Sequence, residues 1–211
     1  MVGILVSQTF VEFSTLLILI LTLGLAIVMS YRYARKRSMP LLYWSMGMWF
    51  FVIGVLLEVI FAFGAYSELL IALYLFVVAM VVESLAIGSM QLIKSGRLRM
   101  SYYIYSVIAA MLLAYSLYAT NIGNVITNHI VFGILPAFVI VTSSIVTFPA
   151  AAILIVIAAI SYRNRHSTKM LSIIAGVLVV SVAGTLYIAA IPSFLYYAEF
   201  IGILLLWLGF M

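Results

Sequence analysis

The sequence contains neither cysteine nor aspartate. The absence of cysteine excludes disulfides, thiolate nucleophiles, cysteine-ligated zinc and iron–sulfur clusters. The absence of aspartate removes the magnesium and phosphoryl-transfer sites on which many membrane lipid enzymes depend. Charge is scarce as well, because 7% of the 211 residues are charged, 68% are hydrophobic and the mean hydropathy is +1.36. Because so few polar groups cannot cover the surface of a soluble fold, we expect that a lipid bilayer surrounds the protein.

Other residues that could carry chemistry are few. His129 and His166 are predicted on opposite sides of the membrane, so they cannot share a metal ion or a haem. Neither histidine has a metal-ligand partner three or four residues further along. We therefore expect no cofactor and no metal site. A serine nucleophile would need a base from another part of the chain, so we also expect that the protein is not an enzyme.

Apolar runs of membrane-spanning length fill the chain. Each span needs about 20 residues, and no linker is long enough to hold a soluble domain. No basic region precedes the first run, so we expect no cleaved signal peptide. Pro136 or Pro149 can end or kink the fifth run, so that span can begin near Phe138 after a separate interfacial turn. We predict an all-α integral membrane protein with one transmembrane domain, 1–211, and seven helices at about 9–30, 41–64, 69–93, 102–119, 132–161, 169–191 and 194–211.

The basic residues predict the orientation. All ten lysines and arginines fall in three short loops, which follow the first, third and fifth predicted helices. Such loops lie on one side of the membrane, and the positive-inside rule makes that side the cytoplasm. We therefore predict a multi-pass protein of the cell membrane with its N-terminus outside and its C-terminus inside. The basic residues are Arg32, Arg35, Lys36 and Arg37, then Lys94, Arg97 and Arg99, then Arg163, Arg165 and Lys169.

Contact with anionic lipid headgroups explains these short juxtamembrane clusters, so we expect no nucleic-acid partner. The expected surroundings are the bilayer and, in addition, other membrane subunits or further copies of the chain. Aromatic residues near the predicted helix ends are typical of interfacial belts. They are Tyr43, Trp44, Trp49, Tyr102, Tyr103, Tyr105, Tyr196 and Tyr197.

Two triplets indicate an internal repeat. The triplet SYR occurs at 30–32 and at 161–163, and YSE at 66–68 corresponds to YAE at 197–199, with the same offset. Chance identity between apolar segments is the alternative. If the repeat is real, its halves are 9–93 and 132–211, and the helix between them inverts the chain so that the halves run parallel.

This arrangement of three helices, one linker helix and three helices resembles that of the SWEET and PQ-loop sugar transporters. More loosely, it resembles that of microbial rhodopsins. The resemblance is one of architecture, since the sequence has no Pro-Gln motif. The last helix, SFLYYAEFIGILLLWLGFM, has no lysine that could form a retinal Schiff base. We therefore assign no family.

Glu83 and Glu58 are the first candidates for function. Glu83 lies roughly 21 Å into the third predicted helix and about 15 Å from Lys94, near the membrane midplane. An ionised carboxylate is costly there unless it is paired, hydrated or protonated, so Glu83 is a candidate proton- or cation-responsive group. Glu58 lies roughly 9 Å below the outer end of its helix and could share a cleft with Glu12 or Glu199. The alternatives are a neutral acid that joins two helices for Glu83 and an interfacial acid for Glu58.

Two further groups are candidates. Clustered carboxylates at the outer side could hold a cation or share a proton, although Glu68 and Glu199 also suit helix N-termini. A polar run before a proline in the fifth helix could line a substrate cavity, or its hydroxyls could simply satisfy the carbonyl that the proline frees. The candidate cavity residues are Thr142, Ser143, Ser144, Thr147 and Pro149, and the candidate outer cluster is Glu12, Glu68 and Glu199.

These features favour a small transporter or channel-like carrier with a midplane carboxylate. The alternative is an accessory or structural subunit of a larger membrane complex, for example a respiratory one. The near absence of soluble loops and the missing catalytic residue types suit that alternative.

Overall fold

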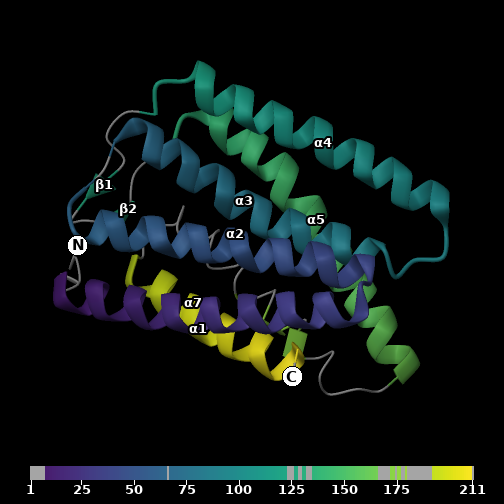
Figure 1. The fold of residues 1–211 in the computed structure, drawn as a ribbon. Helices are drawn as coiled ribbons and strands as arrows, with labels where there is room; N and C mark the ends of the chain where they lie inside the picture. Colours follow the sequence, from purple (N-terminus) through teal and green to yellow (C-terminus); the bar gives the residue numbers. More distant parts are fainter. Residues whose placement is uncertain are drawn as a thin grey trace.

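The computed structural model describes residues 8–65, 67–122, 126–127, 130–131, 135–165, 172–173, 175–176, 179 and 192–210. Long helices make up nearly all of this part, as Figure 1 shows. Two strands of two residues each pair antiparallel between α4 and α5. The elements are α1 (Gln8–Lys36), α2 (Met39–Ala62), α3 (Glu68–Met90), α4 (Gly96–Ala119), β1 (Ile126–Thr127), β2 (Ile130–Val131), α5 (Ala137–Arg165) and α7 (Pro192–Phe210).

Helices α1 to α5 are each long and apolar enough to cross a membrane, which makes the chain a multi-pass membrane protein. In α7 the apolar part is shorter, Tyr196–Phe210. Most of the sixth predicted helix, 169–191, lies outside the described residues, and so do His129 and His166. Seven spans, the orientation and the repeat therefore stay predictions.

Local signals explain two helix starts. Helix α5 begins at Ala137, directly after Pro136, so the prediction of a late start near Phe138 is confirmed and the start at 132 is wrong. Helix α4 begins at Gly96, six residues before the predicted start at 102. The side chain of Ser95 accepts a hydrogen bond from the Leu98 backbone N–H at 3.4 Å. A serine N-cap thus starts α4 while the chain is still rich in arginine.

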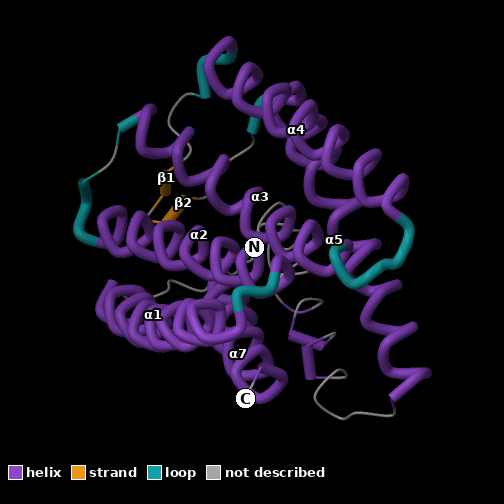
Figure 2. Tube along the Cα trace, turned by 45° about the vertical axis from the view of Figure 1, so that its right-hand side comes forward, coloured by secondary structure: helices purple, strands orange, loops and turns teal. Residues whose placement is uncertain are grey.

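The helices pack as neighbours along the chain, with α7 returning to the start. Helix α2 lies between α1 and α3, α5 packs on α3, and α4 packs on α3 and α5. Helix α7 packs on α1, so α4 and α7 lie at opposite sides of the bundle (Figures 1 and 2). The guanidinium of Arg32 donates to the Phe210 carbonyl and fastens the last turn of α7 to α1.

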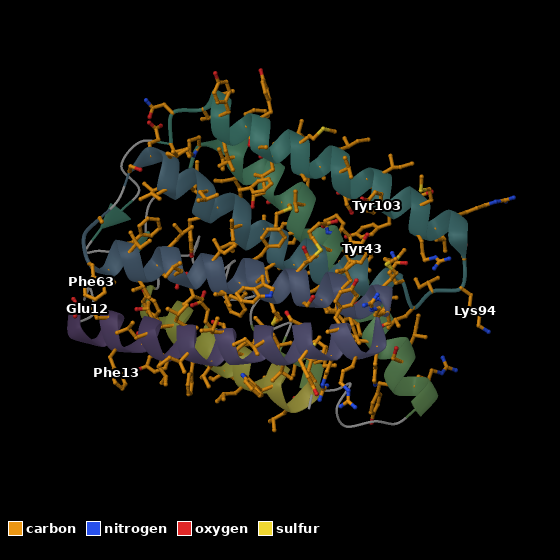
Figure 3. All side chains as sticks on the ribbon, viewed as in Figure 1. Glu12, Phe13, Tyr43, Phe63, Lys94 and Tyr103 are labelled. Carbon is orange, nitrogen blue, oxygen red and sulfur yellow. The ribbon has the colours of Figure 1, made fainter. Side chains whose placement is uncertain are left out.

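One end of the bundle gathers the basic loops. The α1–α2 turn, the α3–α4 loop and the C-terminal end of α5 lie together there, and we call it the basic end. Figure 3 shows Lys94 at this end and Glu12 and Phe63 at the other, the far end. The shared end follows from the alternating helix directions, whereas its assignment to the cytoplasm is the prediction made above.

The three tryptophans lie at three different helix–helix contacts. The indole of Trp44, one of the aromatic residues near the predicted helix ends, lies against α3, where an added Cβ on Gly88 would come within 2.5 Å of it. Glycine at 88 is therefore needed for the close approach of α2 to α3. The indole N–H groups donate from Trp49 to Ser30 Oγ (2.9 Å), from Trp44 to the Leu85 carbonyl (3.2 Å) and from Trp207 to the Leu21 carbonyl (3.0 Å).

Candidate functional site

Three of the five glutamates are buried inside the bundle. The exposed fraction is 2% for Glu83, 6% for Glu58 and 8% for Glu199. Glu83 lies roughly 22 Å from the start of α3 and 10 Å from its end, so it is nearer the basic end than the predicted midplane position. Glu58 lies about 6 Å from the far end of α2. The bundle therefore holds two separate acidic sites at different depths.

Glu83 faces α4. The hydroxyls of Tyr102 and Ser106 lie beside its carboxyl group. Ser106 Oγ donates to the Tyr102 carbonyl at 2.9 Å. Both Glu83 carboxyl oxygens and Tyr102 Oη are buried without a hydrogen-bond partner in the part of the chain that the structure describes. Buried polar atoms without partners are rare, because each costs roughly 1–3 kcal/mol.

Tyr105 connects this site to α5. Its hydroxyl lies close enough to Glu83 to be affected by the carboxylate charge, and its ring stacks on that of Tyr102 with centroids 6.0 Å apart. Tyr105 Oη donates to the Ile145 carbonyl at 2.5 Å. That carbonyl lacks its usual helical donor, because the residue four positions later is Pro149, which has no N–H. The hydroxyl of Tyr105 therefore fills the gap that the proline leaves in α5.

The polar run of α5 makes mostly local hydrogen bonds. Thr142 is 1% exposed and shares a 2.6 Å hydrogen bond with the hydroxyl of Ser116 on α4. Thr147 Oγ1 donates to the Ser143 carbonyl at 3.0 Å. Ser143, Ser144, Thr147 and Pro149 are partly buried. These contacts join α4 to α5 and satisfy hydroxyls within α5.

The second acidic site joins three helices. Tyr74 Oη of α3 donates to Glu58 Oε1 of α2 at 2.7 Å. The carboxyl groups of Glu58 and of Glu199 on α7 lie within hydrogen-bonding reach of each other. The second oxygen of each carboxyl, Oε2, is buried and has no partner among the described residues. The structure thus brings together two acids that are 141 positions apart in the sequence.

The three predicted outer acids have different surroundings. Glu68 is the first residue of α3, and its Oε1 accepts from the Ile122 backbone N–H at 3.0 Å. Glu12 lies near the start of α1, at the far end (Figure 3). The helix N-terminus expected for Glu199 is wrong, because α7 begins at Pro192 and Glu199 lies two turns inside it. Within the described ranges, no three acidic or histidine side chains are grouped closely enough to hold a metal ion.

A groove of about 650 Å³ lies between α3 and α4 at the far end. It is lined by Glu68, Leu73, Phe76, Leu117 and Tyr118, among others, and by none of the buried acids. The groove therefore gives no path to Glu83 in this conformation.

Comparison with protein-family models, curated proteins and solved structures found no match. The geometry of the buried acids is therefore the basis for any functional inference.

Sequence reasoning missed the tyrosines that surround both acids. Tyr102 and Tyr105 were grouped with the interfacial aromatics because they lie near a helix end, yet Tyr102 lies beside the Glu83 carboxyl and Tyr105 lies near enough to be affected by its charge. The spacing of Tyr102, Tyr105 and Ser106 places all three on one face of a helix and was a usable signal. Tyr103 points elsewhere and is 44% exposed, as an interfacial residue would be. Nothing in the sequence around Tyr74 marks it as the partner of Glu58.

Proposed function

We propose that this chain is a small membrane carrier in which Glu83 is the working group, taking up and releasing a proton or a small cation. The observation that supports it is a carboxyl that is 2% exposed and unpartnered within the described residues of a membrane-spanning bundle. A charged group at such depth costs several kcal/mol, and acids kept there usually belong to an ion or substrate pathway.

The link to α5 supports movement at this site. Tyr105 is close to Glu83 and also donates to the carbonyl that Pro149 leaves without a donor. Helices interrupted by proline are common where a transport site opens, because the broken hydrogen bond lowers the cost of bending. Bending of α5 at Pro149 would move Ile145, and Tyr105 would carry that movement to the carboxyl.

Access to Glu83 requires such a movement. The groove at the far end stops short of it, and its side chain is 2% exposed beside α4. We propose seven spans with the N-terminus outside, so Glu83 is nearer the cytoplasmic side. In this arrangement a separation of α4 from α3 at the basic end would open the site inward.

Measurement of proton flux into liposomes that contain the purified protein tests whether the chain is a carrier. Purified protein in liposomes that contain a pH-sensitive dye receives a potassium diffusion potential, and proton entry is recorded with and without sodium. We expect wild type to admit protons or to exchange them for sodium, and Glu83→Gln to fall to the rate of protein-free liposomes. Glu68→Gln is the matched control and keeps the wild-type rate, because Glu68 lies at the start of α3 against a loop amide. Wild-type flux that survives in Glu83→Gln would remove the role of Glu83.

No flux from wild type would contradict the carrier itself. Native purification then tests whether the chain is an accessory subunit of a larger complex. Other subunits that co-migrate with it in a fixed stoichiometry would favour that alternative.

Single-cysteine labelling tests the topology, and the natural chain has no cysteine to interfere. Arg35→Cys, Arg97→Cys and Arg163→Cys lie at the basic end, and Ser67→Cys lies at the far end. An impermeant maleimide added to intact cells is expected to label only Ser67→Cys. Labelling of any of the three arginine positions would overturn the orientation.

A further inference from the structure

The pair formed by Glu58 and Glu199 is separate from the Glu83 site. Along α3, its tyrosine partner Tyr74 lies roughly 13 Å from Glu83. The pair holds α7 to α2 near the far end, whereas the rings of Trp44 and Phe210, 5.5 Å apart, join the same two helices near the basic end. Its chemistry does not depend on whether Glu83 transports anything.

No basic side chain neutralises the pair in the described structure. The lysines and arginines of these ranges belong to the basic end, on the last turns of α1 and α5 and around the α3–α4 loop. The titratable groups facing the pair or at its level are Tyr74 on α3, Tyr196 on α7 and Glu12 on α1. Strand β2 also packs on α2, and its described residues, Ile130 and Val131, are apolar.

Two facing carboxylates cannot both be ionised in such a place. Like charges in contact repel strongly at low dielectric, and each also loses its hydration. One added proton removes the repulsion and leaves a single negative charge, which the protonated acid stabilises by donating a hydrogen bond to the ionised one. The Oε2 atoms of Glu58 and Glu199, each buried and otherwise unpartnered within the described residues, are available for that bond.

The hydrogen bond from Tyr74 favours a proton over a metal ion as the neutralising group. Tyr74 Oη donates to Glu58 Oε1 and thereby stabilises one ionised carboxylate. A calcium ion would need about six to eight oxygen ligands, whereas two carboxyl groups supply at most four, and the described residues offer no third acid at this point.

We infer that Glu58 and Glu199 form a binding site for one exchangeable proton, shared between the two carboxyl groups and joining α2 to α7. Glu58, which accepts from Tyr74, is the member that stays ionised, and Glu199 carries the proton. The bound proton supplies the hydrogen bond that holds α7 to α2 at the far end.

Counting protonated carboxyl groups tests the inference. Infrared spectra of the reconstituted full chain at neutral pH record the carbonyl stretch of protonated carboxyl groups, which shifts on exchange into D₂O. All variants carry Glu83→Gln, which removes the signal of the other buried acid. We expect the Glu83→Gln parent to show one protonated carboxyl. Adding Glu58→Gln or Glu199→Gln removes that band. The glutamine amide donates a hydrogen bond to the remaining carboxylate, which then needs no added proton.

The double variant distinguishes a shared proton from two separate ones. If one proton is shared, the variant that carries both Glu58→Gln and Glu199→Gln loses no more band intensity than either single variant. Two independent losses would overturn the shared site, and so would a band unchanged in both single variants. A band that sodium or calcium at millimolar concentration abolishes would identify a cation site instead. Glu68→Gln is the control and leaves the band unchanged.

Tyr74→Phe keeps the test decisive if a glutamine variant fails to fold. Removal of the tyrosine hydroxyl takes away the preference for an ionised Glu58, so the band is expected to shift and broaden while its integrated intensity stays that of one carboxyl. An unchanged band in Tyr74→Phe would contradict the arrangement.

Discussion

The two acidic sites of this bundle differ in whether hydrogen-bond partners compensate for the burial of their carboxyl groups. At the far end, Glu58 has a tyrosine donor at 2.7 Å and a second acid within reach. Near the basic end, Glu83 is also buried, yet neither of its oxygens has a hydrogen-bond partner in the described chain. One added proton can supply the missing hydrogen bond between Glu58 and Glu199, which we call the far pair. The carboxyl group of Glu83 gains hydrogen bonds only if its surroundings change.

The difference is consistent with a structural role for the pair of Glu58 and Glu199 and with the proposed carrier role for Glu83. A buried polar group whose partners are all present stabilises the fold that supplies them. A buried group whose partners lie beside it but do not bind it weakens the fold, and proteins keep such groups mainly where function needs them. We therefore expect removal of Glu83 to be tolerated by the fold and removal of Glu58 to be damaging.

The largest expected effect is the pH dependence of stability that the far pair creates. The folded pair holds one proton that the carboxyls of the unfolded chain release above their ordinary acidic range. Stability from this proton is complete at acidic pH and is lost as pH rises, by about 1.4 kcal/mol per unit, or about 3 kcal/mol over two units, until the pair releases it. Unfolding by SDS in mixed micelles at several pH values measures the slope. The measurement uses the Glu83→Gln background, so that the other buried acid adds no slope. Glu58→Gln should then remove the slope, and an equal slope in that variant would contradict the pair.

Loss of the acid at 58 should come next in size. Glu58→Leu leaves the Tyr74 hydroxyl buried without its acceptor and Glu199 without its partner. We expect the free energy of unfolding to fall by about 2 kcal/mol, since each unsatisfied group costs roughly 1–3 kcal/mol and part of that is relaxed. Glu58→Gln is the matched control and should lose less than half as much. Equal losses would show that packing, rather than the hydrogen bonds, matters there.

A smaller effect is expected where the Glu83 site meets α5. Tyr105→Phe removes the donor to the Ile145 carbonyl and should cost about 1–2 kcal/mol. Pro149→Ala restores a backbone N–H at that position, so the tyrosine change should cost less in its presence. A double-mutant cycle by SDS unfolding gives the coupling, and additive effects would break the proposed link between the tyrosine and the proline.

The smallest effect on stability is expected at Glu83 itself. Glu83→Leu replaces a carboxyl that has no described hydrogen bond by an apolar group of similar size. We expect no loss of stability, or a gain of up to about 1 kcal/mol, together with loss of flux. If Glu83→Leu destabilised the protein as much as Glu58→Leu, the contrast between the two sites would disappear.

The sequence predicted the parts of the fold that depend on local patterns. Apolar runs between basic loops located the helices, and Pro136 located the start of α5. The midplane acid was predicted to be buried, and it is 2% exposed. Its depth in the membrane stays a prediction; within α3, which ends at Met90, Glu83 lies closer to the end of the helix than to its start.

The sequence could not decide between alternative contacts of distant segments. It offered both Glu12 and Glu199 as neighbours of Glu58, and the choice of Glu199 depends on how α7 returns to lie beside α1 and α2. Apolar residues surround both acids in the sequence, so neither position carries a local mark of its partner. The tyrosines beside Glu83 were misassigned for another reason, since an aromatic residue near a helix end suits the interface and a buried site equally well.

The placement of the indoles has a practical consequence. Each of the three contacts α1–α2, α2–α3 and α1–α7 carries its own chromophore, because Trp49, Trp44 and Trp207 each donate across a different one. Variants that keep a single tryptophan would turn intrinsic fluorescence into a separate gauge for each contact. The fluorescence of such variants would report in real time, and without an added label, which helices separate during the functional cycle.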